Sequence, residues 1–291
     1  MTQDEKLAAI LTAVQIDPGS RGLAKDPHDN LFTACPGDFA AACRLLADGI
    51  IFFGLTGFPI STSDPVRFET DGPLGYYFLR RALVPKHDWV FPLHCFTEKP
   101  IVKAFNAVDQ YLCKSGPTSF DNTSLGRIVI SIERAGPAAD GNCYSMRGAV
   151  LNSYLDTDFN DRFSKPVRKT IAIGDGGNEI GMGKIPHETI VKNIPNGDLI
   201  HCRVPADYLI VAGVSNWGAY ALAAGVFVLR NEKPPSELFD PDLEKRILEI
   251  MVREGPLVDG VTGKQTATVD GLSWEEYIAP FNAIREILEC D

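Results

Sequence analysis

The sequence lacks the motifs by which several large classes of protein are recognised. Its seven cysteines are scattered and form no CxxC pair, which argues against both a disulfide framework and a zinc site. Its five histidines form no HxH or HExxH pattern and offer no histidine-based metal motif. We therefore expect small, mostly buried, reduced thiols, as in a protein of the cytoplasm.

Long apolar runs and basic clusters are missing as well. No run approaches the ~20 apolar residues that a membrane span needs. The first residues, MTQDEKLAAILTAV, are typical of an amphipathic helix rather than a signal peptide. The chain carries 28 basic and 38 acidic residues, a net charge of −10, with no Lys/Arg-rich stretch to follow a phosphate backbone. We therefore expect neither a membrane nor a nucleic acid as a partner.

What the sequence does contain is a series of short apolar runs separated by helical patterns. The runs are continuous rather than alternating in polarity, which is typical of parallel strands buried on both faces. Helical patterns cover 73–83 and about 99–113, among others, and three follow the last run. The expected strands are 49–55, 88–94, 126–134, 169–177 and 207–215. We predict one domain over 1–291 with an α/β fold, a three-layer α/β/α sandwich with a mainly parallel sheet and extra terminal helices.

Glycines and polar residues follow four of these runs directly. Ligands of parallel sheets bind beyond the carboxyl ends of the strands, so the four segments should meet at one edge and form a site there. The candidate residues are Thr56, Gly57, Glu69 and Asp71 after 49–55, Glu133, Arg134, Asp140 and Arg147 after 126–132, Asp175, Gly176, Gly177, Asn178 and Glu179 after 169–173, and Ser215 and Asn216 after 207–213.

The glycine-rich segment GDGGNEIGMGK resembles a phosphate loop in composition but not in spacing. Asn178 and Ile185 occupy positions that the Walker A motif reserves for glycine and for serine or threonine. Glu179 replaces the third glycine of the dinucleotide fingerprint. We interpret the segment as a strand end, a glycine turn and a helix with Asn178 as its N-cap. It remains open whether Asp175 and Glu179 act on a ligand, or only cap the turn and favour the helix dipole.

Two arginines accompany the acids. Arg134 and Arg147 suit the bidentate binding of a carboxylate. The alternative is an internal salt bridge of Arg134 with Asp140 or Glu69. Arginines beside carboxylates suit a small zwitterion such as an amino acid, because they would bind its carboxylate and its ammonium group respectively.

Seven segments of the chain also form a recognisable series. They are PGDFA, TGFPI, ETDGPLG, IERAGPAADGNCYSMRG, GDGGNEIGMGK, ADYLIVAGVSNWGAYAL and DGVTGKQTATVDGLSW, in that order. In these segments the chain resembles the D-glutamate cyclase family, in particular its C-terminal domain, over about residues 36–275. The resemblance implies a lyase that converts D-glutamate to 5-oxo-D-proline with loss of water. It implies no assignment of catalytic residues.

The roles of the residues follow from the chemistry of such a cyclisation. A base must take a proton from the α-ammonium group, and Asp175 or Glu179 would serve. A proton or a Lewis acid must help the departing oxygen, which is a role for Glu133 or Asp71. Carboxylates suit Mg²⁺ or Mn²⁺, the cofactor that we consider. Amide groups of the glycine turn would hold the developing oxyanion. The substrate would be bound and oriented by Arg134, Arg147, Asn178, Ser215 and Asn216.

Two other functions are consistent with the same residues. One is a metal-dependent hydrolase or lactamase that acts on a related amino acid or lactam. The other is a non-catalytic module that binds an amino acid. In each case the partner is a small molecule, and the sequence leaves open whether the chain forms a homo-oligomer.

Overall fold

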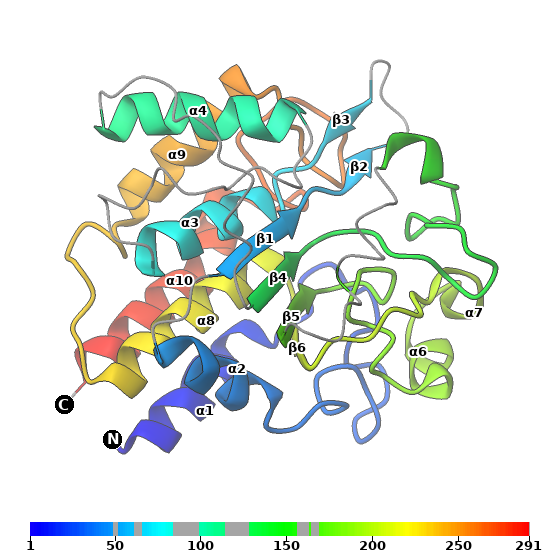
Figure 1. Cartoon of the computed structure of the whole chain (residues 1–291), viewed down its shortest axis with the longest axis horizontal. Helices are drawn as coiled ribbons and strands as arrows, with labels where there is room; N and C mark the ends of the chain where they lie inside the picture. Colours follow the sequence, from blue (N-terminus) through cyan, green and yellow to red (C-terminus); the bar gives the residue numbers. More distant parts are fainter. Residues whose placement is uncertain are drawn as a thin grey trace.

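A parallel sheet forms the centre of the molecule (Figure 1). The structure, a computed structural model, describes residues 1–48, 52–60, 66–83, 99–113, 128–155, 163 and 169–290. The four strands lie side by side in chain order, each parallel to its neighbours: β1 (Phe52–Thr56), β4 (Ile128–Ile132), β5 (Lys169–Gly174) and β6 (Tyr208–Val211). A short antiparallel pair, β2 (Pro59–Ile60) and β3 (Arg67–Phe68), follows β1.

Long helices cover one face of this sheet. Helix α8 (Ser215–Arg230) packs directly on the strands and is buried along nearly its whole length. Further helices pack against α8 or against one another, and both chain ends lie on this side (Figure 1). These helices are α1 (Gln3–Val14), α2 (Asp38–Ala47), α3 (Pro73–Leu83), α4 (Lys99–Cys113), α9 (Pro241–Glu254) and α10 (Trp274–Glu289).

The opposite face of the sheet is covered mainly by loops and two short helices, α6 (His187–Asn193) and α7 (Gly197–Ile200). Successive residues of a strand point to opposite faces. Ile130 accordingly joins the core under the long helices, while Val129 joins the second core. Both faces are buried, which explains why the strands read as continuous apolar runs. The predicted α/β architecture with a mainly parallel sheet is confirmed.

Local sequence signals set the ends of several helices. Thr2 and Glu5 form a capping box at the start of α1, and Ser273 and Glu276 form another at the start of α10. Asp240 caps α9 through its side chain. None of the helices in the described ranges is long and apolar enough to cross a membrane.

Most of the predicted elements that fall on described residues agree with the structure. Helices over 73–83 and 99–113 are confirmed, whereas the strand expected at 88–94 lies outside the described residues. Strands β4 and β5 end within one residue of the predicted starts of the polar segments, after 132 and 173. The last residues of the runs 126–134 and 169–177 form turns, and the end of 207–215 leads into α8. The helix expected to begin at Asn178 is wrong, because the next helix begins at His187.

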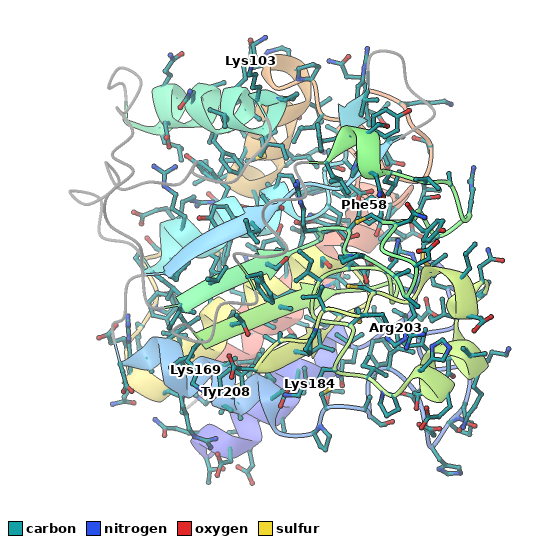
Figure 2. The ribbon with its side chains drawn as sticks, turned by 45° about the vertical axis from the view of Figure 1, so that its right-hand side comes forward. Phe58, Lys103, Lys169, Lys184, Arg203 and Tyr208 are labelled. Carbon is teal, nitrogen blue, oxygen red and sulfur yellow. The ribbon has the colours of Figure 1, made fainter. Side chains whose placement is uncertain are left out.

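The glycine-rich segment instead runs between the two edges of the sheet. It leaves the carboxyl edge at Asp175 and brings Lys184 to the amino edge, where Lys169 and Tyr208 also lie (Figure 2). There the Lys184 ammonium is 2.6 Å from the Asp38 carboxylate and 5.9 Å from the centre of the Tyr208 ring. Lys184 is thus a structural residue on the opposite edge from Asp175.

Candidate active site

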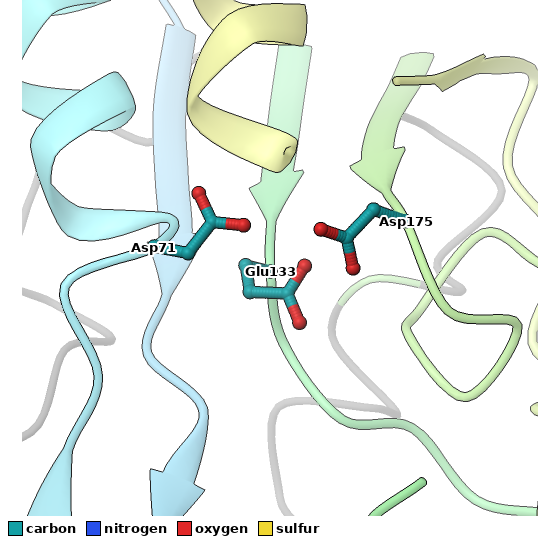
Figure 3. Close-up of side chains that lie close together, drawn as sticks. All are labelled: Asp71, Glu133 and Asp175. Carbon is teal, nitrogen blue, oxygen red and sulfur yellow. The ribbon is translucent and has the colours of Figure 1, made fainter. Parts of the chain in front are cut away.

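Three acids converge beyond the carboxyl ends of β1, β4 and β5 (Figure 3). Glu133 directly follows β4, Asp175 follows β5, and Asp71 lies in the loop before α3. One carboxylate oxygen of each lies within 4.8 Å of those of the other two. Asp71, Glu133 and Asp175 are only 2%, 5% and 4% exposed, respectively. We refer to these three residues as the acid triad.

The first turn of α8 holds Asp71 in place. The backbone amides of Ser215 and Asn216 donate to the two oxygens of Asp71 at 2.9 and 2.8 Å. The amide oxygen of the Asn216 side chain accepts from Gly72 in the same loop and from Gly75 in the first turn of α3, at 2.9 and 2.7 Å. The N-terminus of a helix favours an anion. Ser215 and Asn216, predicted to orient the substrate, therefore bind the acid-bearing loop in this structure.

Glu133 has an unusual backbone. Its φ angle of 47° lies in the left-handed region, which costs a residue with a side chain about 1–2 kcal/mol. Its amide donates to the carbonyl of Ile173 at 3.1 Å, and its carbonyl accepts from the amide of Gly57 at 3.2 Å. Hydrogen bonds to β5 and to the residue after β1 therefore maintain this conformation. The Ser215 hydroxyl donates to its carboxylate at 2.7 Å. Strain of this kind recurs at functional sites.

Backbone amides of the glycine turn bind the carboxylate of Glu179. The amides of Asp175 and Gly177 donate to its carboxylate at 3.2 and 2.8 Å. A Cβ at Gly176 would lie 2.9 Å from this carboxylate, so glycine allows the close approach. Glu179 forms a backbone bridge with Ala135 rather than the first turn of a helix. These amides are occupied, so the predicted oxyanion role does not fit them.

A guanidinium that the sequence analysis missed completes the site. Arg21 forms ion pairs with Asp175 and Asp270, the latter at 2.7 Å. It lies in the loop after α1, which Asp17 holds by accepting from the Arg21 amide at 2.9 Å. Nothing in the loop sequence around Arg21 marks it as a site residue. Asp270 lies within DGVTGKQTATVDGLSW, one of the segments that resemble the D-glutamate cyclase family. This resemblance is the sequence feature that could have indicated Asp270.

Burial and mutual repulsion dominate the electrostatics of these acids. Burial raises the pKa of Glu69 and Glu133, and neighbouring carboxylates raise each pKa further. Burial also raises the pKa of Asp71 to about 7, with Asp270 adding to the effect. At Asp175 burial raises the pKa and Arg21 opposes the rise. Such a site favours protonated acids or a bound cation over free carboxylates.

The other predicted residues occupy different places. Arg134 is buried and donates to the carbonyl of Gly57 at 3.3 Å, whereas Arg147 is exposed. Asp140 is exposed as well, and its carboxylate accepts from Asn142 at 2.8 Å. The side chain of Asn178 donates to the carbonyl of Tyr144 at 2.7 Å. The structure therefore does not bring Asp140 or Arg147 to the acid triad. Asn178 instead helps to anchor the 135–155 loop.

α/β proteins bind ligands beyond the carboxyl ends of the strands of a parallel sheet, which is where these buried acids lie. Comparison with known proteins specifies the family. Residues 10–285 match the family described as "D-glutamate cyclase-like, C-terminal". The chain belongs to this family.

A curated relative is the human mitochondrial D-glutamate cyclase, to which the chain is 32% identical over 262 residues. The match covers 79% of this chain and 40% of the human protein, so the chain spans less than half the length of that relative. The human protein is named as mitochondrial, and the cytoplasmic location expected for this chain stays a prediction.

Proposed function

We propose that the chain catalyses the dehydrating cyclisation of D-glutamate to 5-oxo-D-proline at the acid triad. Family membership and the name of the human relative support the reaction. The observation that carries the proposal is the convergence of buried acids and Arg21 at one edge of the sheet. Such a site offers carboxylates to the substrate ammonium group and a guanidinium near its carboxylates.

The reaction moves two protons from nitrogen to oxygen. The α-nitrogen forms a bond to the γ-carboxyl carbon, and one bond from that carbon to oxygen breaks. The ammonium group gives up two of its three protons, and both leave with the oxygen as water. Because attack is intramolecular, the protein has to fold the substrate and transfer these protons.

Asp175 is the base that the geometry favours. It belongs to the acid triad, and Arg21 contacts it from one side. The carboxylate of Glu179 already accepts two backbone hydrogen bonds, so Glu179 is better suited to positioning Asp175 than to proton transfer. Glu133, with its raised pKa and its contact to Ser215, is placed to assist the departing oxygen.

The direct test is an assay of the chain with D-glutamate, L-glutamate and 5-oxo-D-proline, with products separated by chiral chromatography. We expect one 5-oxo-D-proline for each D-glutamate consumed and little reaction of the L-isomer. Ligand-induced thermal stabilisation without product would instead indicate an amino-acid-binding module. Hydrolysis of other lactams, with D-glutamate unchanged, would indicate the lactamase alternative.

A further inference from the structure

The proposed cyclisation leaves one group of the substrate unchanged, namely its α-carboxylate. The α-carbon of an amino acid carries this carboxylate and the ammonium group together, so the base that takes the ammonium proton must lie beside the group that binds the carboxylate. Arg21 contacts Asp175, the proposed base. We propose that Arg21, held by Asp270, binds the α-carboxylate and makes the site prefer ligands that carry this group. The identity of the substrate rests on the proposed function.

The guanidinium of Arg21 is the accessible member of its two ion pairs. The Arg21 side chain is 17% exposed, whereas those of Asp175 and Asp270 are 6% and 8% exposed. Nη1 of Arg21 and Oδ2 of each acid form no hydrogen bond within the described part of the chain, so the N–H bonds do not point at the oxygens that they face. The guanidinium therefore keeps donors for a ligand, and its planar fork matches a carboxylate.

The loop that carries Arg21 is fixed before any ligand binds. The Asp17 carboxylate accepts hydrogen bonds at 2.9, 2.8 and 3.0 Å from three consecutive backbone amides, beginning with that of Arg21. Ser20 and Gly22, on either side of Arg21, have left-handed backbone with φ angles of 49° and 98°. A group that is held in place in the free protein loses less entropy when it binds its ligand.

Left-handed backbone is concentrated at this site. Five non-glycine residues in the described ranges adopt it, and two of them are asparagines, which tolerate it well. The other three are Ser20 beside Arg21, Glu133 of the acid triad, and Asp270, whose φ angle is 55°. Strain of this kind persists where the surrounding structure enforces it, and it clusters at functional sites. Its distribution therefore joins the Arg21–Asp270 pair to the acid triad.

Asp270 has a fixed position behind Arg21. The carboxylate of the fully buried Asp259 accepts from the amide of Gly271, the residue after Asp270, at 2.7 Å. Asp270 Oδ2 then lies 2.7 Å from Nη2 of Arg21. Asp270 would act on the substrate through Arg21, which makes it a positioning residue rather than a catalytic one.

The two ends of the substrate would then occupy separate places. With the α-carboxylate at Arg21 and the ammonium group at Asp175, the γ-carboxylate extends towards Glu133, which is placed to assist the departing oxygen. The α-carboxylate takes no part in bond making, so its contact to Arg21 is the same in substrate, transition state and product. Loss of this contact should therefore raise KM more than it lowers kcat.

Ligand binding tests this position without turnover. 5-oxo-D-proline and 2-pyrrolidinone share one lactam ring, and only the first carries the carboxylate. In calorimetric titrations the unmodified chain should bind 5-oxo-D-proline at least about tenfold more tightly, because a charged hydrogen bond contributes that much. Arg21→Met should lose this preference and keep the affinity for 2-pyrrolidinone.

Arg246→Met is the matched control, because it removes the same charge from an exposed arginine that pairs with Glu249 on α9 at 2.8 Å. It should keep the preference. Asp270→Asn should weaken the binding of 5-oxo-D-proline alone, a change that a purely structural role would not produce. Circular dichroism checks each fold. Should Arg21→Met not fold, Arg21→Lys replaces it and should lose most of the preference, because an ammonium group cannot form the two parallel bonds of a guanidinium.

The proposal is overturned if the unmodified chain has no measurable preference for 5-oxo-D-proline, or if a folded Arg21 variant retains the preference. The outcomes for this position and for the reaction are separable. Arg21-dependent binding of 5-oxo-D-proline without turnover of D-glutamate would support the role of Arg21 and contradict the proposed function. Turnover of D-glutamate by a chain whose Arg21→Met variant keeps the preference would support the function and overturn the role of Arg21.

Discussion

Buried carboxylates occur in two regions of this molecule, and they differ in their partners. In the helical layer, Asp109 of α4 accepts from Arg80 at 2.9 Å and from the Tyr77 hydroxyl at 2.7 Å. Glu244 of α9 pairs with Arg81 at 2.9 Å and accepts from a tyrosine hydroxyl at 2.9 Å. Each of these acids thus has its own guanidinium and its own hydroxyl group.

The acids at the edge of the sheet have different ion-pair and hydrogen-bond partners. Arg21 is shared between Asp175 and Asp270, while Asp71 and Glu133 receive hydrogen bonds from the start of α8. Burial and the neighbouring Asp270 and Asp71 raise the pKa of Glu69. Burial alone therefore does not mark a functional acid here. The distinguishing feature is a negative charge that the fold holds in place without neutralising it.

The largest expected effect is the loss of catalysis at the sheet edge. Asp175→Asn should lower kcat/KM for D-glutamate at least about a thousandfold, equivalent to about 4 kcal/mol, because it removes the proposed base. Steady-state kinetics measure this effect, and circular dichroism verifies the fold. Near-normal turnover would remove Asp175 from the mechanism. Glu249→Gln should retain full activity.

A change in the helical layer should act on stability instead. Arg81→Met leaves Glu244 buried without its cation, so the free energy of unfolding should fall by about 3–5 kcal/mol. Urea denaturation gives this value. The activity per folded molecule should stay at the level of the unmodified chain. A loss of turnover comparable to that of Asp175→Asn would mean that the two regions are not distinct.

Replacement of Glu69, a buried acid at the edge of the sheet, should increase the free energy of unfolding rather than decrease it. Glu69→Gln replaces a buried acid whose ionised form is disfavoured by burial and by its acidic neighbours, so the metal-free protein should gain about 1 kcal/mol in free energy of unfolding. Denaturation in the presence of a chelator tests this expectation. A marked loss of stability would show that the Glu69 charge has a partner and belongs with the helical layer.

The smallest expected effect concerns a buried histidine of the second core. His201 contacts the carbonyl of Met182 at 3.0 Å and the ring of His187 at 3.1 Å. Burial lowers its pKa, and Arg203 and His187 lower it further despite the contact to Met182.

The unfolded chain therefore takes up this proton first as the pH falls below about 6.5, and stability declines from there towards the folded-state pKa. His201→Gln should reduce the loss of Tm between pH 7 and pH 5. An unchanged pH profile would exclude His201 as its source. His187 and Asp198, which are 3.1 Å apart, are the other titratable groups of this network.

The sheet was predictable because its strands are apolar throughout, and a strand buried on both faces needs that composition. The same logic located Asp71, Glu133 and Asp175, since each lies at or beside the end of a strand. Arg21 was not predictable, because tertiary packing alone brings the loop after α1 to Asp175. Asn178 failed as an N-cap because its side chain binds the carbonyl of Tyr144.

Other predictions depend on properties that single residues do not encode. Arg134 and Arg147 have the same chemistry, yet one is buried under Gly57 and the other is exposed. Their positions depend on how the loop after β4 folds, which no local pattern specifies. The single domain over 1–291, the homo-oligomer and the divalent cation also stay predictions.

Helix α8 links the site to the rest of the molecule. Its first turn binds Asp71 and Glu133, and the remainder is the buried helix against which α1, α2, α3 and α10 pack. The amides of Ser215 and Asn216 can therefore reach solvent only when this whole layer opens. In hydrogen exchange they should be among the slowest amides of the chain, with protection close to that of global unfolding. The carboxylates of the proposed site would then be as rigid as the core itself, and entry of the proposed substrate would depend on motion of other segments.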